Sequence, residues 1–455
     1  MNLFRFLSVK MSRDVNVPIT DEIYTTCEPM VMVSRILGLF PYAVYRDGLN
    51  IMFKKSLVLY VYSYAVALTL VSMIIKGLIS DYEAGDKSVR MKKPLSVYVT
   101  FADVTILAFT VFLGMVGGPT NGKIFKIFVR NLVEVDKIIF LNDRQRMRKV
   151  SMVVLGAVLF CTSTLLALDF STWIRFAMDS IDAEYRVTNY IPFYLAYVIV
   201  VVLQCQFWFV IKALRRRLHV LTKLLSRDRI QKGLIFNVTN NKITNVSLGI
   251  NPGECTGPNC LGEIIDNFGK KTTSKNVIPN YNRHLFDLRQ SDNIETLMKV
   301  YFKLSTAVDC VNKFCGVFLF VCLLSCLIHL VVTPYFLVIE IYGRHDPMYI
   351  SLLCFWIFGH CCRIIGIVEP CYRFKEEEKR MLLAISKLLY FESGGGKFKE
   401  QVKNFFYLVK TTDNQFTALG LAKIDRSLIT TIVGAVTTYL VIVIQFQKSA
   451  VSTNN

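Results

Sequence analysis

The chain has 455 residues, of which 53% are hydrophobic and only 19% are charged, and its net charge is +19. Soluble domains contain about 25% charged residues, so this composition excludes a disordered chain, a small disulfide scaffold and an ordinary cytosolic enzyme. The positive charge does not indicate nucleic-acid binding, because it fits a membrane protein with basic cytoplasmic loops that attract anionic lipid.

Long apolar blocks in chain order predict seven membrane-spanning helices, because about 20 mainly apolar residues cross the hydrocarbon core. These blocks are 56–79, 95–118, 150–172, 190–211, 311–333, 347–368 and 427–447. The fifth could extend to Ile341, since Pro334 can kink a membrane helix without ending it. We therefore expect an all-α integral membrane protein.

Lys and Arg are concentrated on one side of the predicted membrane. Forty-two of the 53 precede the first span or lie between spans 2 and 3, 4 and 5, or 6 and 7. Cytoplasmic loops carry this excess, so the N-terminus is predicted inside and the C-terminus outside. No cleavable signal peptide is visible before the first span, which we expect to direct insertion into the plasma membrane.

Membrane and cytoplasmic segments alternate along the chain. They are a cytoplasmic N-terminal segment (1–55), spans 1 to 4 (56–211), a cytoplasmic extension (212–303), spans 5 and 6 (304–368), a cytoplasmic helical segment (369–426), span 7 (427–447) and an extracellular tail (448–455). The extension contains a flexible insertion over about 233–282, which is rich in Asn, Gly, Thr and Pro.

Three cytoplasmic stretches have helical periodicity. An amphipathic helix is predicted over 123–141, and two more over 369–391 and 398–423, separated by a glycine-rich break. These helices are too apolar to be exposed on all sides. We therefore expect them to pack into an intracellular bundle.

Polar side chains inside the spans are costly in lipid and indicate a partner or a ligand. Asp103 lies in the predicted outer half of span 2, and Asp169 lies near the outer end of span 3. His329, Thr333 and Tyr335 lie in the outer half of span 5, and His360 shares a face of span 6 with Trp356. Near the inner end of span 6, Arg363 and Glu369 are expected to pair with each other or with neighbouring carbonyl groups.

Trp356 lies about ten positions into span 6, deeper than an interfacial aromatic belt would place it. A Trp ring can stack on the C–H faces of a polyol while fixed carboxylate, hydroxyl and imidazole groups bond its hydroxyls. We therefore predict an outer ligand pocket, although helix packing and, for Tyr98, an interfacial belt remain alternatives. The predicted pocket residues are Trp356, Thr333, Asp103, His329, Tyr335 and Tyr98.

Enzyme chemistry is not indicated. The five His residues form no metalloprotease or paired zinc motif, and no nucleophile elbow or nucleotide fingerprint occurs. The pair Cys255 and Cys260 supplies too few ligands for a structural zinc site, and the cysteines in the spans are typical apolar packers. No cofactor or metal is expected.

The seventh predicted span carries a stripe of modest polarity. Thr438 and Gln445 are seven residues apart and share a helix face with Val441 or Ile442. Such a stripe could line a pore that hydrophobic neighbours gate by dewetting. The alternative is that these residues pack helix against helix.

The run Thr438-Tyr439-Leu440-Val441-Ile442-Val443-Ile444-Gln445-Phe446 resembles the C-terminal signature of insect gustatory receptors. That signature is Thr-Tyr, five hydrophobic residues and Gln-Phe, and every position matches. It also lies at the end of the seventh span of an N-inside chain. The stretches 332–340 and 355–380 are similar to the fructose-receptor branch of the same family.

This resemblance implies a sugar-gated, nonselective cation channel with D-fructose as the favoured ligand. Four identical subunits would surround one pore, lined by span 7 and joined by a cytoplasmic anchor formed by 369–426. Gln445 and Phe446 would lie at the gate, and the sugar would bind among spans 1 to 6 on the outer side. The insertion over 233–282 is not part of the family pattern.

Other classes fit less well. A G-protein-coupled receptor has seven spans but the opposite orientation, and its usual span 3 and span 7 motifs are missing. An odorant-type channel subunit that needs a co-receptor shares the architecture and stays open. A secondary transporter would show internal repeats, which are not visible. A purely structural membrane protein would not account for the outer polar residues.

Overall fold

The structure is a computed structural model and describes residues 16–47, 50–88, 91, 94–120, 122–139, 144–178, 188–225, 290–342, 346–391 and 396–452. The predicted insertion over 233–282, with Cys255 and Cys260, lies outside these residues. The chain divides into two compact units. The first comprises Met1–Val220, Val300–Lys379 and Thr412–Asn455, and the second comprises Leu221–Lys299 and Arg380–Thr411.

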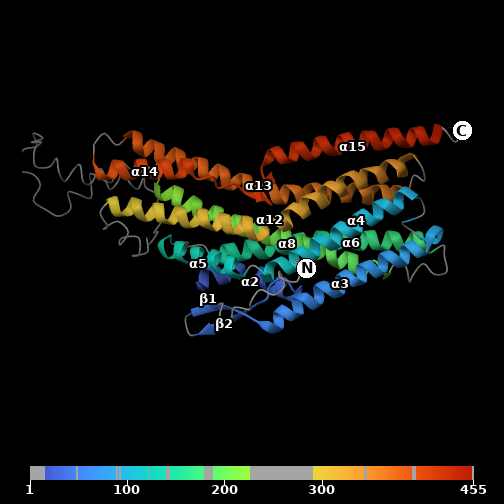
Figure 1. Cartoon of the computed structure of the whole chain (residues 1–455), viewed down its shortest axis with the longest axis horizontal. Coiled ribbons are helices and arrows are strands. Elements are labelled where there is room, and N and C mark those ends of the chain that lie inside the picture. Colours follow the sequence, from blue (N-terminus) through green and yellow to red (C-terminus); the bar gives the residue numbers. More distant parts are fainter. Residues whose placement is uncertain are drawn as a thin grey trace, which may run out of the picture. The chain divides into compact units, whose positions relative to one another are not determined.

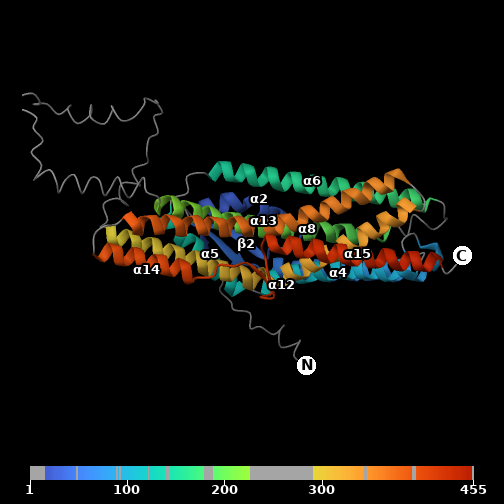
Figure 2. The ribbon, with the colours of Figure 1, turned by 90° about the horizontal axis from the view of Figure 1, so that it is seen from above.

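Each predicted span overlaps one long helix (Figure 1). These are α3 (Leu57–Glu83), α4 (Pro94–Thr120), α6 (Arg144–Ala177), α8 (Ile191–Leu225), α12 (Gln290–Tyr342), α13 (Pro347–Phe391) and α15 (Arg426–Ser452). Within the described residues, the first six are long and apolar enough to cross a membrane, and α15 contributes a shorter apolar stretch, Arg426–Ile442. In the first unit the axes of these helices are roughly aligned with one another (Figures 1 and 2).

Two helices continue without a break through a proline. Helix α12 passes Pro334, so the predicted extension of the fifth span to Ile341 is confirmed. Helix α13 passes Pro370, so the sixth span and the predicted cytoplasmic helix over 369–391 are one element rather than two. Pro370 has no N–H group, and the Gly366 carbonyl therefore lacks its usual partner within the helix.

The segment before the first span has more structure than the sequence indicated. It forms β1 (Asn16–Ile19), α2 (Asp21–Ile36), β2 (Tyr42–Asp47) and β3 (Asn50–Lys55), and the strands pair antiparallel in the order β1-β3-β2. The sheet buries Tyr42, Ile51 and Phe53, and the Tyr42 ring stacks on Phe125 at 4.8 Å. This small sheet anchors the N-terminal segment to the helix that carries Phe125.

That helix is α5 (Gly122–Ile138), which confirms the amphipathic helix predicted over 123–141. Its Asp136 accepts two hydrogen bonds from Arg217 of α8, at 2.7 and 2.6 Å, and both side chains are buried. Its Glu134 is bound by Lys303 and Arg130, and these two cations lower the pKa of Glu134. The buried bidentate pair of Asp136 and Arg217 fixes the register between α5 and α8.

The helix predicted over 398–423 is too long. Helix α14 (Lys397–Thr411) ends before a short antiparallel hairpin of β4 (Thr417–Ala418) and β5 (Ala422–Lys423). Leu419 and Gly420 form the turn with φ of 57° and 73°, a conformation that a helix does not contain. The hairpin then leads into α15.

Candidate ligand-binding site

Aromatic and imidazole rings from α8, α12 and α13 pack together in the region of the predicted pocket. The rings of His329 and His360 stack with centroids 4.5 Å apart and 8° between their planes. Trp356 stacks on His360 at 5.5 Å and meets the edge of Tyr197 at 5.0 Å. All four side chains are buried. Trp356 and His360 are one turn apart on α13, which brings both to this face.

A carboxylate from α6 holds the Trp356 ring in place. The indole Nε1 of Trp356 donates to Oδ1 of Asp169 at 2.9 Å, and the Tyr194 hydroxyl donates to Oδ2 at 2.6 Å. Asp169 is only 7% exposed. A buried carboxylate is tolerated where hydrogen bonds satisfy its oxygens, as these two donors do.

The predicted residues Asp103 and His329 meet between α4 and α12. Oδ1 of Asp103 and Nδ1 of His329 form an ion-pair contact at 2.5 Å. Among the described residues, neither Oδ1 of Asp103 nor Nε2 of His329 has a hydrogen-bond partner. Thr333 lies one turn beyond His329 on the same face of α12 and is also buried. These groups have hydrogen-bonding capacity that a polar ligand could use.

Arg363 lies at one side of the cluster. It donates to the Tyr197 hydroxyl at 3.0 Å and to Oε1 of Gln204 at 3.3 Å, and its guanidinium lies 5.0 Å from the Tyr197 ring centre. The expected pairing of Arg363 with Glu369 is wrong, because Glu369 instead binds Arg373 and Arg426. Six residues separate Arg363 and Glu369, which places them on different faces of α13.

The predicted pocket residues do not all meet. Trp356, His329 and Asp103 come together in the ring cluster, Thr333 and Tyr335 are buried on α12, and Tyr98 is 74% exposed on α4. The predicted pocket list did not include the cluster residues Asp169, Tyr194, Tyr197, His360 and Arg363, although Asp169, His360 and Arg363 had been recognised as polar groups inside the spans. The signal was a charged or phenolic group in an otherwise apolar span, but helix rotation decides which of these face inward.

Helix α15 carries the predicted pore and gate residues and is little covered by its own chain. Thr438, Val441, Ile442 and Gln445 are all exposed. The Thr438 hydroxyl donates to the Gly434 carbonyl at 2.9 Å. Phe446 belongs to α15, but its side chain is not among those that the structure describes. In the described part of the chain, no group of three or more His, Cys, Asp or Glu residues could hold a metal ion.

Comparisons with known proteins place this architecture in a family. Residues 28–450 match the family described as 7tm Chemosensory receptor. The chain is 28% identical over 427 residues to the Gustatory receptor for sugar taste 43a of Drosophila melanogaster, covering 92% of this chain and 97% of that protein. It is 33% identical over 99 residues to Gustatory receptor 68a of the same organism, covering 22% of this chain and 25% of that one.

Solved structures show the same fold. The insect olfactory receptor OR5 from Machilis hrabei in complex with eugenol aligns with a TM-score of 0.58, 11% identity, and coverage of 94% of this chain and 100% of that one. Another OR5 structure from Machilis hrabei gives a TM-score of 0.56 with the same identity and coverage. The expected insect chemoreceptor fold is therefore confirmed. The chain belongs to the seven-transmembrane chemosensory receptor family, whose members are multi-pass receptors of the cell membrane and not enzymes.

Proposed function

We propose that the receptor is a sugar-gated, nonselective cation channel that acts in taste, with D-fructose as its ligand. Similarity to a sugar taste receptor over 92% of the chain supports a sugar, and the similar stretches 332–340 and 355–380 favour fructose. The observation that carries the proposal is the buried ring cluster beside Asp103 and His329, where Nε2 of His329 has no hydrogen-bond partner among the described residues.

The sugar would bind through groups that are not already used. The Trp356 N–H already donates a hydrogen bond to Asp169, so this residue would contact the C–H groups of the sugar through a face of its ring. His329 Nε2, the Thr333 hydroxyl and the Asp103 carboxylate would bond sugar hydroxyls. Tyr335 and Tyr98 would complete the outer wall. Opening of the stack between Trp356 and His360 would make room for the ring of the sugar.

The pore would be formed by α15 from four copies of the chain around one axis. Its exposed residues include Val441 at 49% and Ile442 at 40%, and neighbouring copies or lipid would cover this apolar area. Because the Thr437 and Thr438 hydroxyls donate their hydrogens to their own backbone, they present oxygen lone pairs outward. Rings of such acceptors suit cations.

Gating would follow from a difference in sugar affinity between the closed and open arrangements, since a ligand shifts an equilibrium only by that difference. Binding between α12 and α13 would let α15 move outward. Phe446 would then leave the axis, and Gln445 would face the permeating cations.

The test is current in excised outside-out patches from cells that express this chain alone, with fructose, glucose or sucrose outside and no GTP inside. A rapid, fructose-selective current that reverses near 0 mV with sodium and potassium on opposite sides is expected. Silence from protein shown to be at the surface would contradict a homomeric sugar channel. Current restored only by a co-expressed subunit would indicate an odorant-type subunit, and dependence on GTP would indicate a G-protein-coupled receptor.

A further inference from the structure

Arg426, the first residue of α15, is bound to α13 by two different interactions. Its Nη2 donates to both carboxylate oxygens of Glu369, at 3.1 and 3.0 Å, and its Nε donates to Oε2 at 3.2 Å. The guanidinium carbon also lies 3.8 Å from the centre of the Tyr372 ring. Paired charged hydrogen bonds and a stacked aromatic ring fix both the position and the orientation of a guanidinium.

The rest of α15 makes little contact with its own chain. Among the side chains of α15 that the structure describes, only Ile432 is buried. Asp425 caps the helix by accepting from the Ser427 backbone N–H at 2.9 Å, which stabilises its first turn but does not join it to another helix. Arg426 therefore joins the first turn of α15 directly to α13.

Glu369 belongs to the same uninterrupted helix as the candidate ligand site. Trp356, His360 and Arg363 precede it on α13, and Arg363 lies only six residues away, which is about 9 Å along the helix. A displacement of α13 at the ring cluster therefore reaches Glu369 through one continuous backbone.

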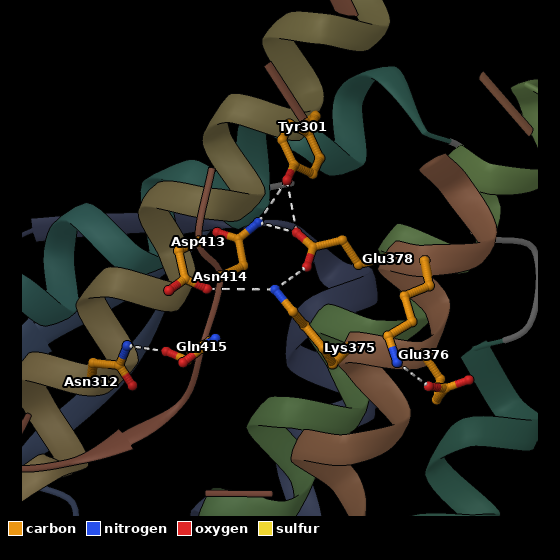
Figure 3. A network of polar contacts seen from close by, with 9 residues as sticks. Tyr301, Asn312, Lys375, Glu376, Glu378, Asp413, Asn414 and Gln415 are labelled. Atoms are coloured by element: carbon orange, nitrogen blue, oxygen red, sulfur yellow. Dashed lines mark hydrogen bonds and ion pairs between the residues drawn. The ribbon is translucent and has the colours of Figure 1, made fainter. Parts of the chain in front are cut away.

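Below Glu369, α13 is fixed by a buried polar network (Figure 3). Glu378 accepts from the Tyr301 hydroxyl at 2.7 Å and from the Asn414 amide at 2.6 Å, and it pairs with Lys375 at 2.7 Å. Tyr301 belongs to α12, and Asn414 lies in the connection to α15. This network therefore attaches this part of α13 to α12 and to the connection that leads to α15.

Helix α13 is most easily bent between these two regions. Pro370 removes the hydrogen bond to the Gly366 carbonyl, and Gly366 has no side chain to restrict its backbone. Glu369 is adjacent to this point. Movement of the upper part of α13 relative to this attached part would therefore change the position of the Glu369 carboxylate.

We propose that Glu369, Tyr372 and Arg426 form a coupling clamp that transmits movement of the ligand-binding part of α13 to the base of the pore helix. The three are positioning residues, since they lie outside the candidate ligand site and the proposed gate. This inference rests on the proposed function, because it names the connection by which sugar binding opens the channel.

The test compares Glu369→Gln, Arg426→Gln and the double variant with the wild type. Each single variant is expected to lower the maximal fructose-evoked current per surface receptor at least fivefold. Fructose binding should be unchanged, measured as the fructose concentration that gives half of the maximal thermal stabilisation of the purified receptor. The double variant is expected to be no worse than the worse single variant. The charge-exchanged Glu369→Arg/Arg426→Glu receptor should recover at least half of the current.

Arg373→Gln is the matched control, because Arg373 donates to the same carboxylate at 2.7 Å but lies on α13 itself. It should keep the wild-type current. Independent losses that multiply in the double variant, or no recovery on charge exchange, would overturn the clamp. If Arg426→Gln fails to reach the surface, Arg426→Lys serves instead and should show a smaller loss, because it keeps the charge without the paired hydrogen bonds.

Failure of the proposed function is distinguishable from failure of the clamp. A wild type that gives no sugar current contradicts the function. The clamp then has its own readout in hydrogen exchange of the purified receptor without sugar. Arg426→Gln should accelerate exchange at residues 427–432 at least threefold, and Arg373→Gln should not. Equal exchange in wild type and Arg426→Gln would overturn the clamp.

Discussion

The indole Nε1 of Trp356 donates a 2.9 Å hydrogen bond to Oδ1 of Asp169, and this joins α13 to α6 across 187 positions of the sequence. In the proposed pocket, Trp356 would therefore contact the sugar through the faces of its ring, one of which stacks on His360 in this structure. Asp169 orients that ring, since its carboxylate oxygens accept hydrogen bonds from Trp356 and Tyr194.

Asp169→Asn is expected to destabilise the receptor. The amide group can accept only one of the two hydrogen bonds, and loss of a charged hydrogen bond costs about 1.5–3 kcal/mol. The midpoint of thermal unfolding of detergent-purified protein should fall by several degrees. Asp309→Asn, at an exposed carboxylate of α12, is the control and should leave the midpoint unchanged. Equal midpoints for the two variants would contradict the role of Asp169.

Trp356→Ala is expected to weaken the fructose response while assembly is preserved. Loss of one stacking surface should raise the half-maximal fructose concentration at least tenfold, since about 1.4 kcal/mol corresponds to a factor of ten. Concentration–response curves in patches, with surface biotinylation, measure this. Phe355→Ala removes the neighbouring aromatic ring, which is 58% exposed, and should have no such effect. A wild-type curve for Trp356→Ala would exclude this ring from the pocket.

Thr333→Val tests a hydrogen bond to the sugar without a change of volume. Removal of one hydroxyl partner costs about 0.5–1.5 kcal/mol, so the half-maximal fructose concentration should rise about two- to tenfold. His329→Ala should raise it further, because it also leaves Asp103 without its neighbour. Thr306→Val, at a half-buried threonine of α12 whose hydroxyl donates to the Phe302 carbonyl, provides the comparison. If Thr306→Val and Thr333→Val shift the curve equally, the shift does not come from the pocket.

Thr438→Val and Thr437→Val distinguish a pore-lining hydroxyl from its neighbour. Adjacent helix positions point about 100° apart, so only one of these exposed residues can face the axis. Single-channel conductance should fall in Thr438→Val, which loses the outward oxygen, and should stay unchanged in Thr437→Val. The reverse result would show that Thr437 rather than Thr438 faces the pore axis, and that α15 is rotated relative to the proposed arrangement.

Phe446→Ala is expected to raise the current that flows without sugar. Truncation of a hydrophobic gate removes the barrier that keeps the constriction free of water. Resting current before and after sugar application measures the effect. Val433→Ala, more than three turns earlier on α15, should keep a low resting current. Unchanged resting current in Phe446→Ala, with normal surface expression, would count against this residue as the gate.

The sequence by itself determined the membrane architecture. Length and apolarity are local properties, so each of the seven blocks could be recognised before any packing was known. The Pro334 region was also predictable, since helices in membranes tolerate proline. The terminal signature indicated the family, and the family match over residues 28–450 agrees with it.

Tertiary structure alone decided which polar groups meet. Hydropathy places Asp169 and Arg363 at a depth but does not fix the rotation of their helices, and so it could not pair the first with Trp356 or separate the second from Glu369. The hairpin at Leu419 and Gly420 and the N-terminal sheet were likewise invisible. The hairpin strands β4 and β5 have two residues each, too few to show an alternating pattern. In the N-terminal sheet, β1 pairs with β3 across the whole of α2, a contact that leaves no local period to read.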